Sequence, residues 1–341
     1  MGALNAQSPP LESGHWTASA GGGFLVPHRS VIRGLIDGHA QRVELSWSNK
    51  GYGYWAATRT QPQWGVSLSI TDAGSSQHIG TQIAAVSHVD LALRGRLHFR
   101  LGGGLGWTQK PWDARTRQGR ERVVLGSAIN GAAQIGLGFL SSLNPVLWHE
   151  HVGLHLRLDH QSNASFTQPN LGTNVVSLSV STHLRKKPSL FRASDGDYVD
   201  ILPAPIHGGY VFLGVGQRQP SPLSAREDVL ECGYEYRLGQ QSRIGYITGA
   251  LLMLRPGHWG SSLHAGFQLR FSRVYIDLIH GRYVQRWQSE ENQYNRVVLN
   301  VHLHQGLWSR LVLHTHGFRA HHPSIGIAWV PRNQAPFAAL K

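Results

Sequence analysis

The sequence predicts an all-β fold, an antiparallel β-barrel that spans a membrane with about 12–14 strands. Apolar and polar residues alternate with a period of two over stretches of about ten residues, as in strands with two different faces. The polar positions hold arginine, histidine and glycine more often than lysine and glutamate. Trp and Tyr often lie near the ends of these stretches, where a membrane barrel has its aromatic girdles.

Residues 93–107 show the alternation most clearly. One face carries apolar side chains and the opposite face carries basic residues and glycine. The apolar set is Leu97, Phe99, Leu101, Leu105 and Trp107, and the other set is Arg94, Arg96, His98, Arg100, Gly102, Gly104 and Gly106. Similar stretches lie at residues 43–48, 64–71 and 297–304. Turn-rich pieces separate them, which predicts a succession of strands.

Residues 123–140 form the best candidate for a membrane-spanning helix, because all 18 positions are uncharged. However, this stretch contains Asn130, Gln134 and four glycines, which suit a lipid-exposed helix poorly. Its apolar residues recur at every second position. We therefore interpret it as another strand.

No linker and no change of composition divides the chain, so we expect a single barrel domain over residues 16–341. An N-terminal segment, residues 1–15, precedes it. Leu4-Asn5-Ala6 before Gln7 resembles the end of a signal peptide without its charged and apolar parts. This predicts a mature exported protein whose start has been replaced.

Residues 154–163 contain the strongest candidate site. Leu154, Leu156 and Leu158 share one face, and the same parity continues to His160 and Ser162. Two residues apart on a strand, the latter two have backbones about 6.6 Å apart. A histidine at that distance can activate a serine hydroxyl as a nucleophile. On the outer face of a barrel, such a nucleophile would meet only lipid.

Asn174 is the candidate third member of this site. The next strand begins near residue 174, and Asn174 shares the apolar face of Val176 and Leu178. If the two strands pair as a hairpin, Asn174 returns beside His160. It could then accept a hydrogen bond from the imidazole and fix its tautomer.

Residues 160–164 and 168–174 carry the pattern His-x-Ser-Asn followed by Pro-Asn-x-Gly. This pattern resembles the signature of the lipid A 3-O-deacylases, the PagL-like acyloxyacyl hydrolases. The first ~190 residues also resemble the longer Bacteroidetes-type members of that family. The further matches are residues 25–29, 110–113 and 127–139, with weaker ones at Thr315-His316 and residues 326–329.

The resemblance implies an enzyme of the Gram-negative outer membrane that hydrolyses the ester at the 3 position of lipid A. It implies His160 as general base, Ser162 as nucleophile and Asn163 as an oxyanion donor, without metal or cofactor. The partner would be lipid A within lipopolysaccharide. The oligomeric state is not predicted.

Asn174 departs from the best-known family members, which have a glutamate at this position. An amide can orient His160 but cannot stabilise its imidazolium by charge, and it could hold the wrong tautomer. Asp159 does not replace the acid, because it points to the opposite face. We therefore expect slower turnover, or a substrate slightly different from lipid A.

The basic balance, 32 Lys and Arg against 19 Asp and Glu, gives a net charge of +13. The phosphates of lipopolysaccharide are a suitable partner for it. Nucleic acid is not expected, since residues 185–187 form the only tight basic run and no nucleic-acid motif accompanies them. A single cysteine, Cys232, excludes an internal disulfide and a cysteine-rich zinc site.

Histidine pairs are interpreted as polar lining of the barrel interior, in preference to a metal site. They are His149/His151, His302/His304, His314/His316 and His321/His322. Two other functions stay open. A non-catalytic outer-membrane barrel, either a narrow channel or a structural protein, would explain the missing acid. A soluble β protein that binds acidic glycans would explain the charge.

Overall fold

The computed structural model describes most of the chain. The described residues are 14–50, 62–94, 96–112, 124–142, 151–184, 206–221, 223–239, 244–271, 274–285, 291–304, 306–316 and 319–330. Among them, no helix is long and apolar enough to cross a membrane. Residues 1–13, Asp113, His149 and residues 185–187, which the sequence analysis singled out, lie outside this set.

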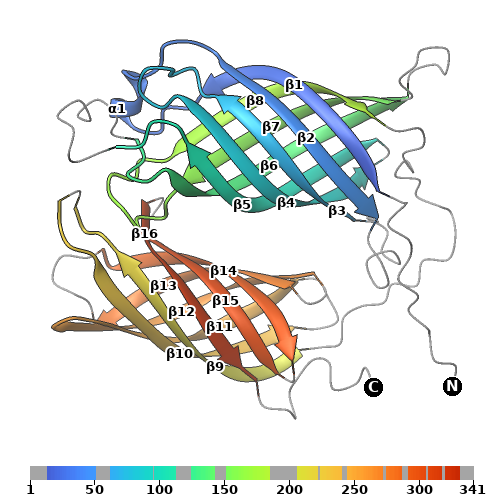
Figure 1. Cartoon of the computed structure of the whole chain (residues 1–341). Coiled ribbons are helices and arrows are strands. Elements are labelled where there is room, and N and C mark those ends of the chain that lie inside the picture. Colours follow the sequence, from blue (N-terminus) through green and yellow to red (C-terminus); the bar gives the residue numbers. More distant parts are fainter. Residues whose placement is uncertain are drawn as a thin grey trace, which may run out of the picture. The chain divides into compact units, whose positions relative to one another are not determined.

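The predicted all-β, antiparallel barrel class is confirmed, with one short helix, α1 (Ser30–Arg33), in the described part. The first closed barrel contains β1 to β8 (Figure 1). These strands are β1 (His15–Leu25), β2 (Ala40–Lys50), β3 (Gln63–Asp72), β4 (Thr81–Arg94), β5 (Leu97–Thr108), β6 (Ile129–Ser142), β7 (His151–Ser162) and β8 (Thr173–His183).

A second closed barrel contains β9 to β16, drawn in yellow to red in Figure 1. Its strands are β9 (Ile206–Arg218), β10 (Glu227–Gly239), β11 (Ile244–Arg255), β12 (His258–Phe271), β13 (Val274–Gln285), β14 (Gln293–His304), β15 (Leu307–His316) and β16 (Arg319–Trp329). Neighbouring strands are antiparallel throughout, and β16 pairs with β9 to close the ring.

The expectation of one barrel with 12–14 strands over residues 16–341 was wrong in strand number and closure. β8 pairs with β1, for example at Val180 and Ala20, so the first sheet closes after eight strands. The cause lies in the pattern itself. Alternation identifies the two faces of a strand, but it is identical in both barrels and does not say which strands close a ring.

The strands of the first barrel have an apolar outer face and a mostly polar inner face, the reverse of a soluble domain, whereas the interior of the second barrel also holds buried apolar and aromatic side chains. In β3, burial alternates at every residue: Val66, Leu68 and Ile70 are 45–51% exposed, whereas Ser67 and Ser69 are 5% exposed. A surface with this distribution suits contact with lipid acyl chains. The predicted two-faced strands are therefore present.

A buried ion network crosses the interior of the first barrel. Glu44 forms ion pairs with Arg42 at 2.5 Å, Arg157 at 2.8 Å and Arg100 at 3.2 Å. Arg100 also binds Asp90 through two parallel hydrogen bonds of 2.6 and 2.7 Å. An eight-stranded barrel is just wide enough for side chains to fill. These groups therefore link strands on different sides of the interior.

The second barrel has a comparable network. Arg310 lies 3.0 Å from Glu235, and Arg296 lies 3.2 Å from Glu231. Arg237 pairs with Asp277 at 3.5 Å. All of these groups are buried, and each of these ion pairs forms within the second barrel.

Replacing Glu44 with Ala should lower the free energy of unfolding by about 3–5 kcal/mol, because three buried guanidinium groups lose their shared carboxylate. Urea unfolding in lipid vesicles, followed by tryptophan fluorescence, measures the change. The control is Ser46→Ala, a buried uncharged site on the same strand, which should cost at most about 1 kcal/mol. Equal losses in the two variants would contradict the role of the network.

Candidate active site

His160 and Ser162 lie at the end of β7, on the outer side of the first barrel. Their parity is that of Leu154, Leu156 and Leu158, which are 38–49% exposed on the apolar surface. Both candidate residues are half-buried. By contrast, Asp159 faces the interior, where its carboxylate lies 3.0 Å from Nε of Arg42. The outward orientation expected from alternation is the one the structure has.

Asn174 lies opposite His160, as the hairpin prediction required. The register of β7 and β8 makes these two residues direct partners. Oδ1 of Asn174 is 2.7 Å from Nδ1 of His160. The structure thus brings the first and third candidate residues into contact on the outer surface.

His28 extends this contact into a chain of hydrogen bonds. Nε2 of His28 is 2.6 Å from the carbonyl oxygen of Leu171, and Nδ1 of His28 is 2.9 Å from Nδ2 of Asn174. A carbonyl oxygen can only accept, so Nε2 of His28 must carry the proton. In the neutral ring Nδ1 is then an acceptor, and it receives an N–H from the Asn174 amide.

The orientation of the Asn174 amide determines the tautomer of His160. Because Nδ2 of Asn174 donates to His28, Oδ1 faces His160 and accepts the Nδ1–H of that ring. Nε2 of neutral His160 is then unprotonated, the form that a general base needs. The concern that an asparagine would hold the wrong tautomer is met by His28, although an amide still supplies no charge.

Asn170 holds Ser162 and the turn that follows it. Oγ of Ser162 donates to Oδ1 of Asn170 at 3.0 Å, and the backbone N–H of Asn163 donates to the same oxygen at 3.1 Å. Asn163, the predicted oxyanion donor, is 6% exposed. Its backbone N–H is therefore engaged by Asn170 in this structure.

Gly172 lies directly against both candidate catalytic side chains. A Cβ atom at this position would lie 3.1 Å from Cε1 of His160 and 3.6 Å from Cβ of Ser162. The residue has a φ of +71°, which other residues adopt at a cost. A glycine is thus needed here for backbone conformation and for space.

His28, Asn170 and Gly172 are the site residues to which the sequence analysis gave no role. All three lie within stretches quoted for the resemblance, and only the Pro-Asn-x-Gly spacing signalled two of them. The contact between His28 and Leu171 joins residues 143 positions apart. No local pattern in the sequence predicts such a contact.

A family model described as lipid A 3-O-deacylase (PagL) matches residues 41–183. This range covers β2 to β8 and includes His160, Ser162, Asn163 and Asn174. The predicted resemblance is confirmed for the first barrel. The similarity to the longer Bacteroidetes-type members stays a prediction.

Solved structures of outer-membrane proteins are also similar to this chain. The outer membrane enzyme PagL is 20% identical, with 48% of this chain and 97% of that chain covered and a TM-score of 0.32. A mutant porin of Rh. blastica is 8% identical (93% and 99% covered, TM-score 0.18), and the siderophore receptor PirA from Pseudomonas aeruginosa is 9% identical (95% and 81%, 0.22). These superpositions are too loose to support an argument. The search of curated proteins finds no match.

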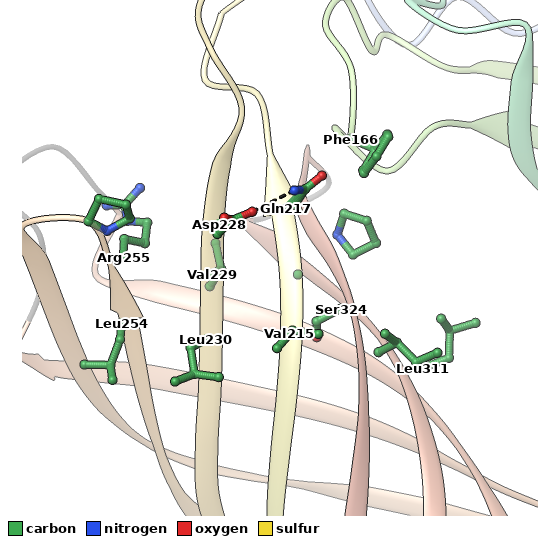
Figure 2. Close-up of a pocket in the computed structure, with 14 residues that line it drawn as sticks. Phe166, Val215, Gln217, Asp228, Val229, Leu230, Leu254, Arg255, Leu311 and Ser324 are labelled. Carbon is green, nitrogen blue, oxygen red and sulfur yellow. Dashed lines mark hydrogen bonds between the residues drawn. The ribbon is translucent and has the colours of Figure 1, made fainter.

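A hollow on the outer face of the second barrel is a further candidate for a binding surface (Figure 2). Its lining is mostly apolar, with Val215, Leu230, Leu254 and Leu311 among the residues. Gln217 donates to Asp228 at 2.6 Å beside it. Val215 and Leu311 are 56% and 55% exposed, so we assign it to the apolar outer surface of this barrel.

One group in the described residues could hold a metal ion: Glu231, His314 and His322, in the second barrel. None of these residues belongs to the site at His160.

In an assay of ester hydrolysis with lipid A as the test substrate, replacing Gly172 with Ala should lower any rate shown by the unchanged protein by about tenfold or more, because the methyl group presses on the ring of His160 and the backbone is strained by about 1–2 kcal/mol. Mass spectrometry of lipid A measures the rate. Gly103→Ala on β5 is the control, since a Cβ there meets no atom closer than 4.0 Å. Equal rates for the two variants would show that Gly172 does not shape the site.

Proposed function

We propose that the first barrel is an outer-membrane serine hydrolase that removes the ester-linked acyl chain at the 3-O position of lipid A. The observation that carries this proposal is the outward-facing His160, which shares one face of β7 with Ser162 and has its Nδ1 held by Asn174. The family match over residues 41–183 supports the choice of lipid. An ester of a membrane lipid is the substrate that can reach this surface from the bilayer.

In the proposed first step, Oγ of Ser162 attacks the ester carbonyl while Nε2 of His160 takes the hydroxyl proton. The C–O bond to the sugar breaks, and the protonated His160 returns the proton to the sugar oxygen. The acyl chain remains on Ser162. Water, activated by the same histidine, then releases the 3-hydroxy fatty acid and restores the serine.

The hydroxyl of Ser162 must rotate away from Asn170 before it can give its proton to His160. Catalytic hydrogen bonds often form only when the substrate is bound. We propose that the side-chain amide of Asn163, together with backbone N–H groups that follow it, holds the oxyanion. Asn170 then keeps this turn in place.

Asn174 and His28 take the place of the usual acid. The imidazolium that forms on His160 is stabilised by a hydrogen bond to the neutral Oδ1 of Asn174, without the negative charge of a carboxylate. A neutral partner stabilises this intermediate less than a carboxylate does. We therefore propose slower turnover than in relatives with an acid, or a closely related acylated lipid as substrate.

The excess of basic residues, +13 overall, suits the phosphates of lipopolysaccharide as the partner. A channel function is disfavoured, because the ion networks of the two barrels occupy the interiors that an ion would have to cross. The remaining alternative is a non-catalytic barrel, which would leave every acyl chain in place.

Replacing Ser162 with Ala should lower the rate of deacylation by about 10³-fold or more, since the nucleophile is lost. The purified protein is incubated with lipid A in detergent, and the products are identified by mass spectrometry. The matched control is Ser87→Ala on β4, an exposed serine of the same barrel, which should leave the rate unchanged. A wild type that removes no acyl chain would refute the proposed function.

Replacing His28 with Leu should lower kcat by about 10–100-fold in the natural background. Without His28 as an acceptor, the side-chain amide of Asn174 can rotate by 180° and present its N–H group to His160 in place of Oδ1. In an Asn174→Glu background both carboxylate oxygens are acceptors, so the same His28→Leu change should cost little. Measuring kcat for the four combinations gives the coupling between the two sites. An equal loss in both backgrounds would mean that His28 serves only the local fold.

A further inference from the structure

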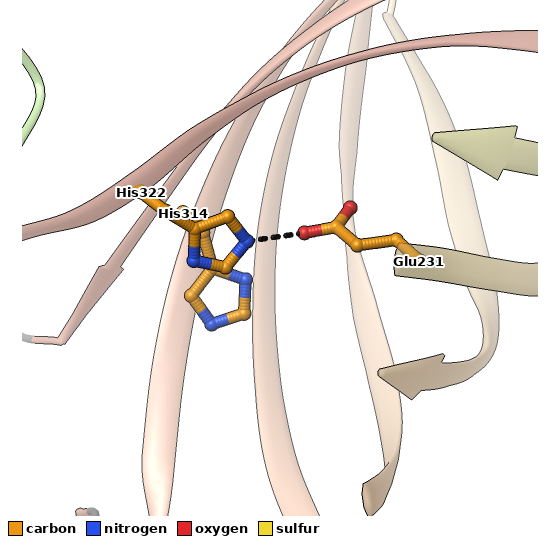
Figure 3. Close-up of side chains that lie close together, drawn as sticks. All are labelled: Glu231, His314 and His322. Atoms are coloured by element: carbon orange, nitrogen blue, oxygen red, sulfur yellow. Dashed lines mark hydrogen bonds and ion pairs between the residues drawn. The ribbon is translucent and has the colours of Figure 1, made fainter. Parts of the chain in front are cut away.

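The second barrel has no part in the proposed hydrolysis, yet its interior contains a compact group of histidines. Glu231 on β10, His314 on β15 and His322 on β16 are at most 1% exposed (Figure 3). One ligand atom from each lies within 4.8 Å of the other two. Ligand atoms bound at about 2.0–2.2 Å around a tetrahedral ion lie about 3.4 Å apart, so small side-chain rotations would bring these three groups onto one ion.

His314 has a buried ring nitrogen without a hydrogen-bond partner. Its Nε2 lies 3.0 Å from the hydroxyl of Tyr283, but its Nδ1 makes no hydrogen bond. A buried polar atom left without a partner costs about 1–3 kcal/mol. A metal ion would satisfy this nitrogen directly.

The carboxylate of Glu231 is already oriented for a ligand. Arg296 and Ser324 both donate to its Oε2 at 3.2 Å. Its other oxygen, Oε1, lies 2.6 Å from Nε2 of His322. Partners of this kind, which hold a ligand from behind, are typical of metal sites.

Glycines on β9, the strand between β16 and β10, let these groups lie close to its backbone. A Cβ atom on Gly216 would lie only 3.2 Å from Cδ2 of His322, and one on Gly214 would lie 3.9 Å from Cβ of Glu231. His322 therefore lies against the backbone of β9, where a side chain larger than that of glycine would not fit.

Two further histidines connect the buried group with less buried positions. His316 and His321 are half-buried, and their rings are 4.5 Å apart. The ring of His321 lies 4.9 Å from that of His322. An ion could therefore be passed along imidazoles on its way to the buried ligands.

We propose that Glu231, His314 and His322 form a binding site for a first-row divalent metal ion, with Zn²⁺ as the ion that fits best. Two imidazole nitrogens and one carboxylate oxygen suit Zn²⁺, whereas Ca²⁺ and Mg²⁺ prefer oxygen ligands alone. The ion replaces the proton between His322 and Glu231, which is released to water. The fourth position of a tetrahedral ion remains for water.

The test uses the untagged full chain in detergent, treated with EDTA and then titrated with Zn²⁺ by calorimetry. We expect about one ion per chain. His314→Gln and His322→Gln should each weaken binding by about 10–100-fold, because each removes one ligand. The control is His88→Gln, which alters a buried histidine 3.6 Å from Asp90 in the first barrel and should leave binding unchanged.

Absence of Zn²⁺ binding by the wild type, or unchanged binding in both variants, would overturn the proposal. If the variants fail to fold, X-ray absorption of the Zn²⁺-loaded wild type decides, since it should show two imidazoles and one oxygen ligand from the protein. A spectrum without imidazole would refute the site. These results do not depend on lipid A hydrolysis, so the two proposals can fail separately.

Discussion

The structure depends on one constraint: a strand whose outer face meets acyl chains must place its polar side chains inside. In the first barrel this interior is narrow, and charges within it are stable only as a connected network. Glu44 meets that need by pairing with arginines from β2, β5 and β7. The network thus does more than neutralise charge, because it fixes these strands relative to one another.

The network also supports the candidate active site from behind. Arg157 and Asp159 lie on the interior face of β7, and each is bound to a partner across the barrel. His160 follows Asp159 directly and points the other way. One strand thus has an ion-paired inner side and carries the candidate site on its outer side. Catalytic geometry benefits from such support, since small displacements of a base reduce the rate strongly.

The use of an amide in place of an acid is physically reasonable at a lipid-facing surface. A carboxylate there would have to be partly desolvated, which is costly without a paired cation. The chain from Leu171 through His28 and Asn174 to His160 contains no charge in its resting form. It keeps the imidazole oriented at a low desolvation cost. In return, the amide stabilises the imidazolium form of His160 less than a carboxylate would.

Much of this site follows from alternation in the sequence. Parity places His160 and Ser162 outside, and the hairpin places Asn174 opposite His160, as the register shows. The role of His28 did not follow, because its contacts reach residues more than 140 positions away. The number of barrels did not follow either. Closure of the first barrel depends on the pairing of its first strand, β1, with its last strand, β8. The paired residues Ala20 and Val180 look like any other outward-facing pair in the sequence.

The second barrel obeys the same constraint with a different set of side chains. Its interior also pairs glutamates with arginines, but histidines of β15 and β16 gather at one part of it. Histidine is suited to such a place because it is stable as a neutral group and still offers a lone pair. Arginine always carries charge and therefore needs an acid nearby. A buried region that has one carboxylate for several histidines is consequently better matched to a bound cation than to further arginines.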